Sequence, residues 1–295
     1  TLTTSTPIHY QNGLENEAKL LAQRLKDITG SDFTVKNTTP AANTISLQTG
    51  KVVVNATNKE AYQLTINDKG VVITGSDAAG VFYGTQSLVS MIPTSVYTQK
   101  SSSIGLEYVQ IEDAPRFHFR SMQLDVSRNF QTKESILRLL DVLAFYKLNH
   151  FLLYTTEDEG WRLEIEGLPE LTQVGAQRQH ISSYKNAALH PGYGSGPIAY
   201  DKGKHGSGFY SKADFIEILK YAHARHIKII PEVNLPGHAH AAIKAMEARY
   251  ERLMKEGKQN EANEYRLIDP NDKSVYLSAQ GYKDNVVDVT KESTY

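Results

Sequence analysis

A run of three acidic residues, Glu157-Asp158-Glu159, stands after an apolar segment and directly before Gly-Trp-Arg. Carboxyl groups held at the end of a strand can take part in proton transfer, orient a histidine or bind a cation. A run of like charges is nevertheless more typical of a solvated loop. Its chemistry therefore depends on the residues that the fold brings to it.

Arg128 follows Asp125 by three positions in the segment L-D-V-S-R-N-F. A planar guanidinium can bridge two adjacent hydroxyl groups, so Arg128 is a candidate ligand for a molecule that carries such a pair. The alternative is an ion pair with Asp125 or with Glu232. Asp125 could itself contact that molecule or only orient Arg128, and both interpretations stay open.

His238 follows a Pro-Gly dipeptide and forms an H-x-H pair with His240. A histidine titrates near neutral pH and can support proton transfer, although a locally hydrogen-bonded structural role is commoner. The pair could also bind a metal ion. His223 and His226 belong to the opposite end of the strand expected over 227–233, so they cannot complete one site with the pair. We therefore expect neither a metal nor a cofactor.

These candidates all follow expected strands. From residue 116 onward the hydrophobic pattern predicts alternating strands and helices: strands over 122–126, 150–154 and 227–233, and helices starting at Thr132, over 211–226 and over 239–256. Such alternation predicts a parallel sheet, and parallel folds carry active sites on the loops that follow the strands. The candidate residues lie on those loops.

The first 110 or so residues predict a separate α+β unit. We expect a helix over 14–28 that Gly30 ends, a strand over 44–47, a hairpin over 62–73 and a helix over 77–92. Glycine favours the left-handed conformation that often ends a helix. The sequence Asp113-Ala114-Pro115 marks the domain boundary.

Composition excludes several classes of protein. The 295 residues include 32 Lys and Arg against 33 Asp and Glu, a net charge of −1, so a nucleic-acid-binding surface is not expected. The absence of cysteine excludes disulfides, iron–sulfur clusters and thiol nucleophiles. We expect no membrane span, because no apolar run reaches the roughly 18 residues that a spanning helix needs. The first residues do not resemble a signal peptide.

Three longer segments resemble glycoside hydrolase family 20, the β-N-acetylhexosaminidases, and especially bacterial chitobiases. They are L-D-V-S-R-N-F at 124–130, E-D-E-G-W-R-L-E-I-E-G-L-P-E-L-T-Q-V-G-A at 157–176 and I-I-P-E-V-N-L-P-G-H-A at 229–239. The segment A-G-V-F-Y-G-T-Q-S-L at 79–88 resembles the family's accessory domain. The resemblance implies an α/β protein, with an accessory α+β domain over 1–112 and the first three βα units of a (β/α)8 TIM barrel over 113–295.

The implied activity is removal of terminal β-linked N-acetylglucosamine or N-acetylgalactosamine from glycans or chitooligosaccharides, with retention of configuration. In such a substrate-assisted reaction the acetamido oxygen of the sugar attacks C1. The resemblance implies that Arg128 holds O3 and O4 of the terminal sugar. It also implies that Glu157 or Asp158 supports His238, which contacts the acid Glu. Periplasmic or secreted localisation follows only from what such enzymes digest.

Two departures from the family qualify this expectation. The family carries its acetamido-orienting Asp and its acid Glu in an H-x-G-G-D-E-like segment, which this sequence lacks. The family's H-x-H-L-[ST]-D-D is replaced by L-L-Y-T-T-E-D at 152–158. We therefore expect an incomplete barrel whose remaining strands come from downstream sequence or another chain, and we expect residues 1–295 alone to be inactive and poorly soluble. The alternatives are a non-catalytic glycan-binding relative and a metallohydrolase that uses the H-x-H pair.

Overall fold

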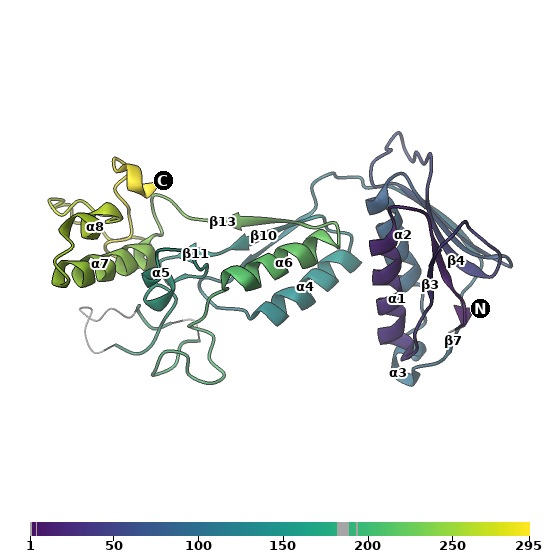
Figure 1. The fold of residues 1–295 in the computed structure, drawn as a ribbon, viewed down its shortest axis with the longest axis horizontal. Helices are drawn as coiled ribbons and strands as arrows, with labels where there is room; N and C mark the ends of the chain where they lie inside the picture. The colour runs from purple at the N-terminus through teal and green to yellow at the C-terminus, as the bar shows by residue number, and fades with distance from the viewer. Residues whose placement is uncertain (1, 4, 182–188, 193) are drawn as a thin grey trace. The chain divides into compact units, whose positions relative to one another are not determined.

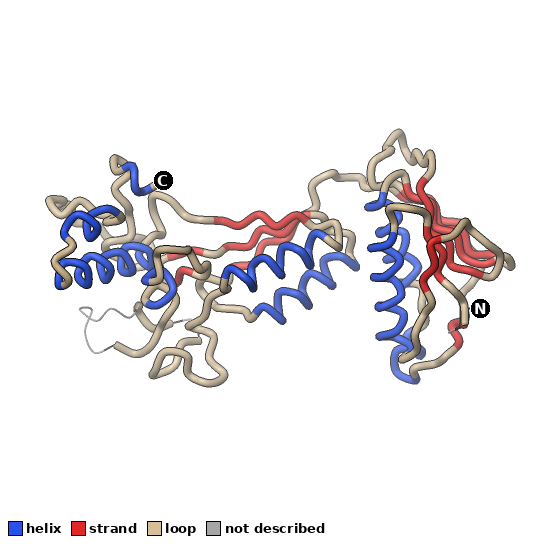
Figure 2. Tube along the Cα trace, viewed as in Figure 1, coloured by secondary structure: helices blue, strands red, loops and turns tan. Residues whose placement is uncertain are grey.

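The computed structural model describes residues 2–3, 5–181, 189–192 and 194–295 (Figures 1 and 2). The chain divides into two compact units. Unit 1 contains Thr1–Arg120, Leu140–Asn149 and His223–Ile227, and unit 2 contains Ser121–Leu139, His150–Ala222 and Lys228–Tyr295. Both units are discontinuous in sequence.

Unit 1 is built on a six-stranded mixed sheet with the order β3-β2-β4-β6-β5-β8. The strands are β2 (Ile8–Tyr10), β3 (Val35–Asn37), β4 (Thr44–Thr49), β5 (Tyr62–Asn67), β6 (Gly70–Gly75) and β8 (Val109–Asp113). Strands β5 and β6 form the predicted hairpin, which is confirmed. A separate antiparallel pair joins β1 (Leu2–Thr3) to β7 (Ser103–Ile104).

Helices α1 (Glu15–Thr29), α2 (Ala78–Ser90) and α3 (Thr94–Gln99) also belong to unit 1. The apolar residues of α1 recur at helical spacing and are buried, which confirms the predicted helix. Gly30 ends it with a φ of 78°. The side chain of Asp77 accepts a hydrogen bond from the Gly80 amide and so caps α2, within one residue of the predicted start.

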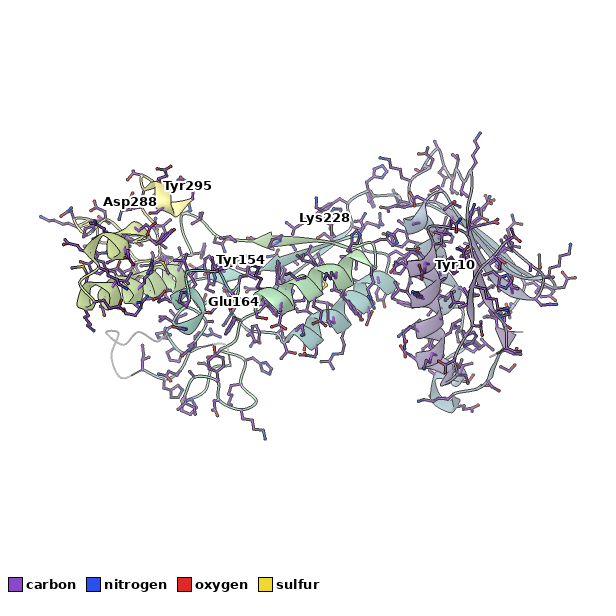
Figure 3. The ribbon with its side chains drawn as sticks, viewed as in Figure 1. Tyr10, Tyr154, Glu164, Lys228, Asp288 and Tyr295 are labelled. Atoms are coloured by element: carbon purple, nitrogen blue, oxygen red, sulfur yellow. The ribbon has the colours of Figure 1, made fainter. Side chains whose placement is uncertain are left out.

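Unit 2 contains a parallel sheet of β9 (Ser121–Asp125), β10 (His150–Tyr154) and β13 (Lys228–Glu232), with β10 in the centre. The three predicted strands and their parallel pairing are confirmed. Tyr154 stands opposite both Asp125 and Glu232 in the register. Figure 3 shows Tyr154 at the end of β10 and Lys228 at the start of β13. The carboxyl ends of all three strands therefore meet at one edge.

Helices α4 (Lys133–Phe145) and α6 (Lys212–His223) run beside each other along this sheet (Figure 1). Lys133 of α4 pairs with Asp214 of α6 at 2.8 Å. The predicted capping box is present, since Ser211 Oγ donates to Asp214 and accepts from the Asp214 amide. Helix α6 ends at His223, three residues before the predicted end, because His226 takes a left-handed φ of 57°.

The remaining elements follow the strands of unit 2. They are the hairpin strands β11 (Thr156–Glu157) and β12 (Gly160–Trp161), helices α5 (Glu170–Gln173), α7 (His240–Lys255) and α8 (Gln259–Glu264), and a 3₁₀ turn (Glu292–Thr294). Leu171 of α5 and Met246 of α7 share a small core with Trp161. The described residues form three adjacent barrel-like βα units and do not close a barrel. Within those residues, no helix is long and apolar enough to cross a membrane.

Candidate active site

Arg128 lies just beyond β9 and is surrounded by carboxylates. Its Nη1 is 2.5 Å from Asp125 Oδ2, its Nη2 contacts Glu157 Oε1, and its Nε is 3.7 Å from Glu159 Oε2. Its guanidinium also lies over the Tyr154 ring, 5.5 Å from the centroid. Burial opposes the charge of Arg128, but the neighbouring carboxylates outweigh burial and raise its pKa. Arg128 is therefore a permanent cation whose side chain is still 29% exposed.

Glu157 reaches two different partners from the β11–β12 hairpin. The carboxylate is fully buried, and the same Oε1 that contacts Arg128 lies 2.8 Å from His238 Nδ1. Tyr154 donates its hydroxyl hydrogen to Oε1 at 3.1 Å, while the Asp158 amide donates to Oε2 at 2.5 Å. A single carboxylate thus connects the loops that follow β9, β10 and β13.

Asp158 is buried and holds two backbone segments in place. Its Oδ1 accepts from the His240 amide at 3.0 Å, and its Oδ2 accepts from Asn285 Nδ2 at 3.1 Å. The Asp158 Oδ2–His238 Nδ1 distance is 3.7 Å, longer than the corresponding distance from Glu157. Of the two carboxylates that the sequence left open, Glu157 is the one nearer to His238.

Glu159 is the third buried carboxylate of the run, only 4% exposed. Burial, together with the charge of Glu157, raises the pKa of Glu159 to about 7. Burial likewise raises the pKa of Tyr154 to about 12, and Glu157 adds to that shift. A group that titrates near neutral pH therefore lies next to a permanently charged arginine.

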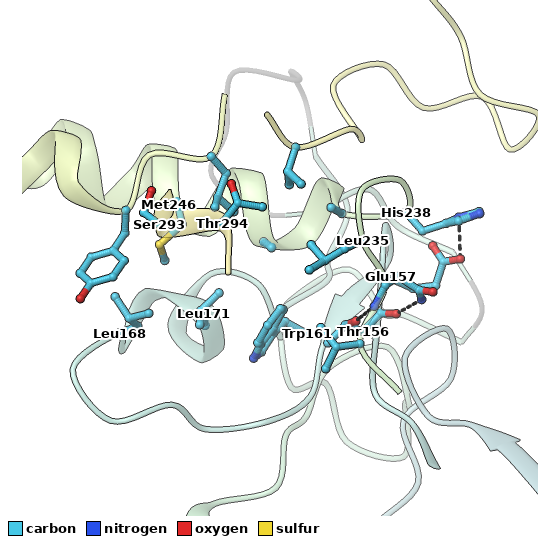
Figure 4. A pocket seen from close by; sticks show the side chains of 17 residues that line it. Thr156, Glu157, Trp161, Leu168, Leu171, Leu235, His238, Met246, Ser293 and Thr294 are labelled. Carbon is cyan, nitrogen blue, oxygen red and sulfur yellow. Dashed lines mark hydrogen bonds and ion pairs between the residues drawn. The ribbon is translucent and has the colours of Figure 1, made fainter. Parts of the chain in front are cut away.

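His238 lies at the start of the loop that leads into α7, with a left-handed φ of 56°. Its side chain is 40% exposed, and its Nδ1 approaches Glu157 without the alignment of a hydrogen bond. Figure 4 shows His238 and Glu157 at one end of a cavity of about 150 Å³, with Trp161 and Leu171 along its wall. Trp161 donates its indole hydrogen to Leu163 O at 2.6 Å.

Among the described residues, the group that could hold a metal ion contains His238 but not His240. His240 Nδ1 lies 3.2 Å from Asp284 O, and burial lowers the pKa of His240. Glu157, Asp158 and His238 have one ligand atom each within 4.8 Å of one another. Glu157 Oε1, however, already contacts Arg128, and a cation there would meet the guanidinium charge. The donor set suits an ion-pair network better than a metal ion.

The structure brings together five of the residues singled out from the sequence: Asp125, Arg128, Glu157, Asp158 and His238. Sequence reasoning missed Tyr154 and Asn285. Tyr154 could have been found from its place at the end of the central strand, next to Asp125 in the register. Asn285 is 127 residues from Asp158, and no local pattern marks it.

Comparison with known proteins decides the family. Residues 117–295 match the glycosyl hydrolase family 20 catalytic domain, and residues 1–114 match domain 2 of that family. The chain belongs to glycosyl hydrolase family 20. It is 49% identical over 235 residues to an N,N'-diacetylchitobiase of Vibrio harveyi, covering 79% of this chain and 26% of that protein. It is 44% identical over 260 residues to a beta-hexosaminidase of Vibrio vulnificus, covering 85% of this chain and 29% of that protein.

Solved structures of the family share the fold. The crystal structure of a family 20 exo beta-N-acetylglucosaminidase from Vibrio harveyi in complex with N-acetylglucosamine has a TM-score of 0.80 and 27% identity, covering 99% of this chain and 40% of that chain. The family 20 beta-N-acetylhexosaminidase of Streptomyces coelicolor has a TM-score of 0.64 and 32% identity, covering 82% of this chain and 44% of that chain. The chain therefore spans less than half the length of each of these four relatives.

Proposed function

We propose that the full-length protein containing this chain is an exo-β-N-acetylhexosaminidase that acts on glycans or chitooligosaccharides. The observation that carries this proposal is the convergence of Arg128, Glu157 and His238 at the carboxyl edge of the sheet, in a chain of family 20. A periplasmic or secreted location fits a polymeric glycan substrate.

In the proposed reaction the acetamido oxygen of the terminal sugar forms a bond to C1 as the C1–O bond to the leaving group breaks. A Glu donates a proton to the departing oxygen, and an Asp orients the acetamido group. Water then adds to C1 from the side that the leaving group left and gives a proton to the Glu carboxylate, while the bond between C1 and the acetamido oxygen breaks, so the configuration is retained and the acetamido group is restored. The Asp and the Glu have no counterpart in this sequence, so we propose that other parts of the full-length protein supply them and the remaining strands.

Arg128 anchors the sugar in this proposal, and Asp125 orients it. The guanidinium is positioned by buried or half-buried carboxylates and keeps an exposed part to present to sugar hydroxyls. His238, next to the buried Glu157, supports the acid. The assignment of Arg128 rests on its charge-assisted hydrogen bonds to Asp125 and Glu157, which are stronger than neutral ones. The assignment of His238 rests on the 2.8 Å approach of its Nδ1 to Glu157.

The test is Arg128→Ala in the full-length protein, assayed on an aryl N-acetylglucosaminide. Losing charge-assisted hydrogen bonds to the substrate should lower kcat/KM by roughly 30-fold or more. Arg252→Ala is the matched control, because Arg252 pairs with the buried Glu170 on α5. A change under about threefold for Arg128→Ala, or an equal loss in both variants, would exclude the anchoring role.

The alternative of a non-catalytic glycan binder rests on the altered second motif at 152–158. Turnover by the full-length protein excludes it, whereas sugar binding that depends on Arg128 without any turnover supports it. Residues 1–295 alone should bind weakly and turn over nothing, because general acid catalysis by itself is worth roughly 10²–10⁴-fold. Turnover by the purified 295-residue chain would show that its own carboxylates do the chemistry.

A further inference from the structure

Two fully buried arginines, Arg162 and Arg178, lie beneath the turn that carries Arg128. A buried cation is expensive unless its hydrogen-bonding groups are satisfied. Burial, together with the charge of Arg178, lowers the pKa of Arg162 to about 9, so Arg162 still carries its charge at neutral pH. The hydrogen bonds of the two guanidinium groups show which parts of the backbone they hold in place.

Arg162 binds backbone carbonyls of two separate loops. Its Nε donates to Val126 O at 3.1 Å, and its Nη2 donates to Ser127 O at 2.6 Å. The rest of the guanidinium donates to carbonyls of the long loop that follows β12, at Ala176, Gly206 and Gly208. The side chain thus ties the end of β9 to the long loop.

Arg178 binds the next carbonyl of the same turn. Its Nη2 donates to the carbonyl of Arg128 itself at 2.6 Å, and its Nε donates to Gly206 O at 2.9 Å. Arg162 Nη2 also donates to Gly206 O, at 3.0 Å. Three consecutive carbonyls of the turn, from Val126 to Arg128, therefore point at two guanidinium groups that share one further carbonyl.

The opposite side of the turn is held as well. The amides of Ser127 and Arg128 both donate to Asp125 Oδ1, at 2.9 and 3.0 Å. Ser127 Oγ donates to Gly160 O at 2.5 Å, which joins the turn to the β11–β12 hairpin. Peptide groups fixed on both their amide and carbonyl sides leave the turn little freedom to reorient.

We propose that Arg162 and Arg178 are positioning residues that fix the direction in which Arg128 presents its guanidinium to the sugar. The carbonyls of Ala176, Gly206 and Gly208, in the described part of the segment between β12 and α6, are on this view what supports the Arg128 turn through the two guanidinium groups. The inference rests on the proposed role of Arg128 as the sugar anchor. Binding groups must be held within roughly half an ångström of their productive geometry, so a loosened turn weakens the anchor even when the protein folds.

The hydrogen bonds of Arg178 require the planar guanidinium, which carries several donors in a fixed geometry. A lysine at position 178 keeps the charge but is a point donor without a planar fork, so it cannot serve Arg128 O and Gly206 O in the same geometry. Arg178→Lys should therefore loosen the turn while retaining the buried charge. Arg162 makes more of these bonds, so Arg178 is the gentler site for a test.

The experiment is a double-mutant cycle in the full-length protein, with kcat and KM measured on an aryl N-acetylglucosaminide. Arg178→Lys in the otherwise unchanged protein should lower kcat/KM by about tenfold, mostly through KM. In an Arg128→Ala background the same change should cost less than about twofold, because the anchor is already absent. Arg120→Lys is the matched control, since Arg120 binds the carbonyls of Phe117 and Lys147 in unit 1.

A purely structural role gives a different result. If Arg178→Lys costs the same factor in both backgrounds, or if Arg120→Lys changes KM equally, the positioning role is wrong. If Arg128→Ala itself does not lower kcat/KM, the proposed function of Arg128 is wrong. The double-mutant cycle reports that result separately from the effect of Arg178→Lys. Arg178→Gln, which keeps one donor without the charge, is the second variant. If neither variant folds, the proposal is wrong, because Arg178 would then be required for folding and not for positioning Arg128.

Discussion

Removing Arg128 should also weaken the fold locally, and the structure allows the size of the effect to be estimated. Glu157 is fully buried and loses one of its partners, although Tyr154 and the Asp158 amide still donate to it. Breaking a buried ion pair costs about 3–5 kcal/mol, whereas an exposed pair is worth up to about 1 kcal/mol. Arg128 is 29% exposed, so Arg128→Ala should cost about 2 kcal/mol of local stability.

Hydrogen exchange followed by mass spectrometry measures this locally. A loss of about 2 kcal/mol corresponds to roughly 30-fold faster exchange in peptides from β9 and the β11–β12 hairpin. Adding Glu157→Gln removes the unpaired charge and should restore most of the protection. Arg252→Ala is the control, and it should leave those peptides unchanged. Exchange within about threefold of the unmodified protein, or no recovery in the double variant, would refute the reasoning that Glu157 depends on Arg128.

Three further predictions concern single positions. Burial raises the pKa of Glu159 from 4.5 to about 7, so the folded state holds this proton more tightly than the unfolded state and loses stability as the pH rises from about 4.5 to about 7. Glu159→Gln should therefore stabilise the full-length protein more at pH 8 than at pH 5, by about 1–3 kcal/mol in urea unfolding, and equal effects at both values would disprove this. Gly160→Ala should destabilise by about 1–3 kcal/mol, because a Cβ would lie 2.6 Å from the guanidinium carbon of the tied Arg162; an unchanged thermal midpoint would contradict it. Asp77→Ala removes the cap of α2 and should cost about 1 kcal/mol, whereas Asp77→Asn should cost little, and a larger loss for Asn than for Ala would be inconsistent with capping.

The sequence predicted the strands and the loops of the site because both have local signatures. Alternating βα segments place the carboxyl ends of parallel strands at one edge, and the candidate residues follow those ends. The ends of β9, β10 and β13 agree with those of the three predicted strands to within two residues. Helix α6 was predicted too long, because a left-handed residue such as His226 leaves no hydrophobic pattern.

The connections within the site were less predictable. Glu157 lies on β11, three residues beyond the end of β10, and two-residue strands such as β11 and β12 have no periodicity to detect. The acidic run could equally have been a solvated loop by composition, yet all three of its residues are buried. Arg162 and Arg178 would be expected at the surface, because arginines are mostly exposed; their burial depends on carbonyls that lie up to 50 residues away.

The discontinuity of unit 1 bears on how freely the N-terminal region can be exchanged between proteins. Residues 1–120 form a unit only together with two short segments from later in the chain. Glu17 of α1 is buried at 2% exposure, and His226 Nε2 lies 2.8 Å from its carboxylate. Tyr62 similarly accepts a hydrogen bond from Lys147 at 2.8 Å. A transplant that moved residues 1–120 alone would leave a buried acid without its histidine, so recombination should succeed only when both later segments travel with the domain.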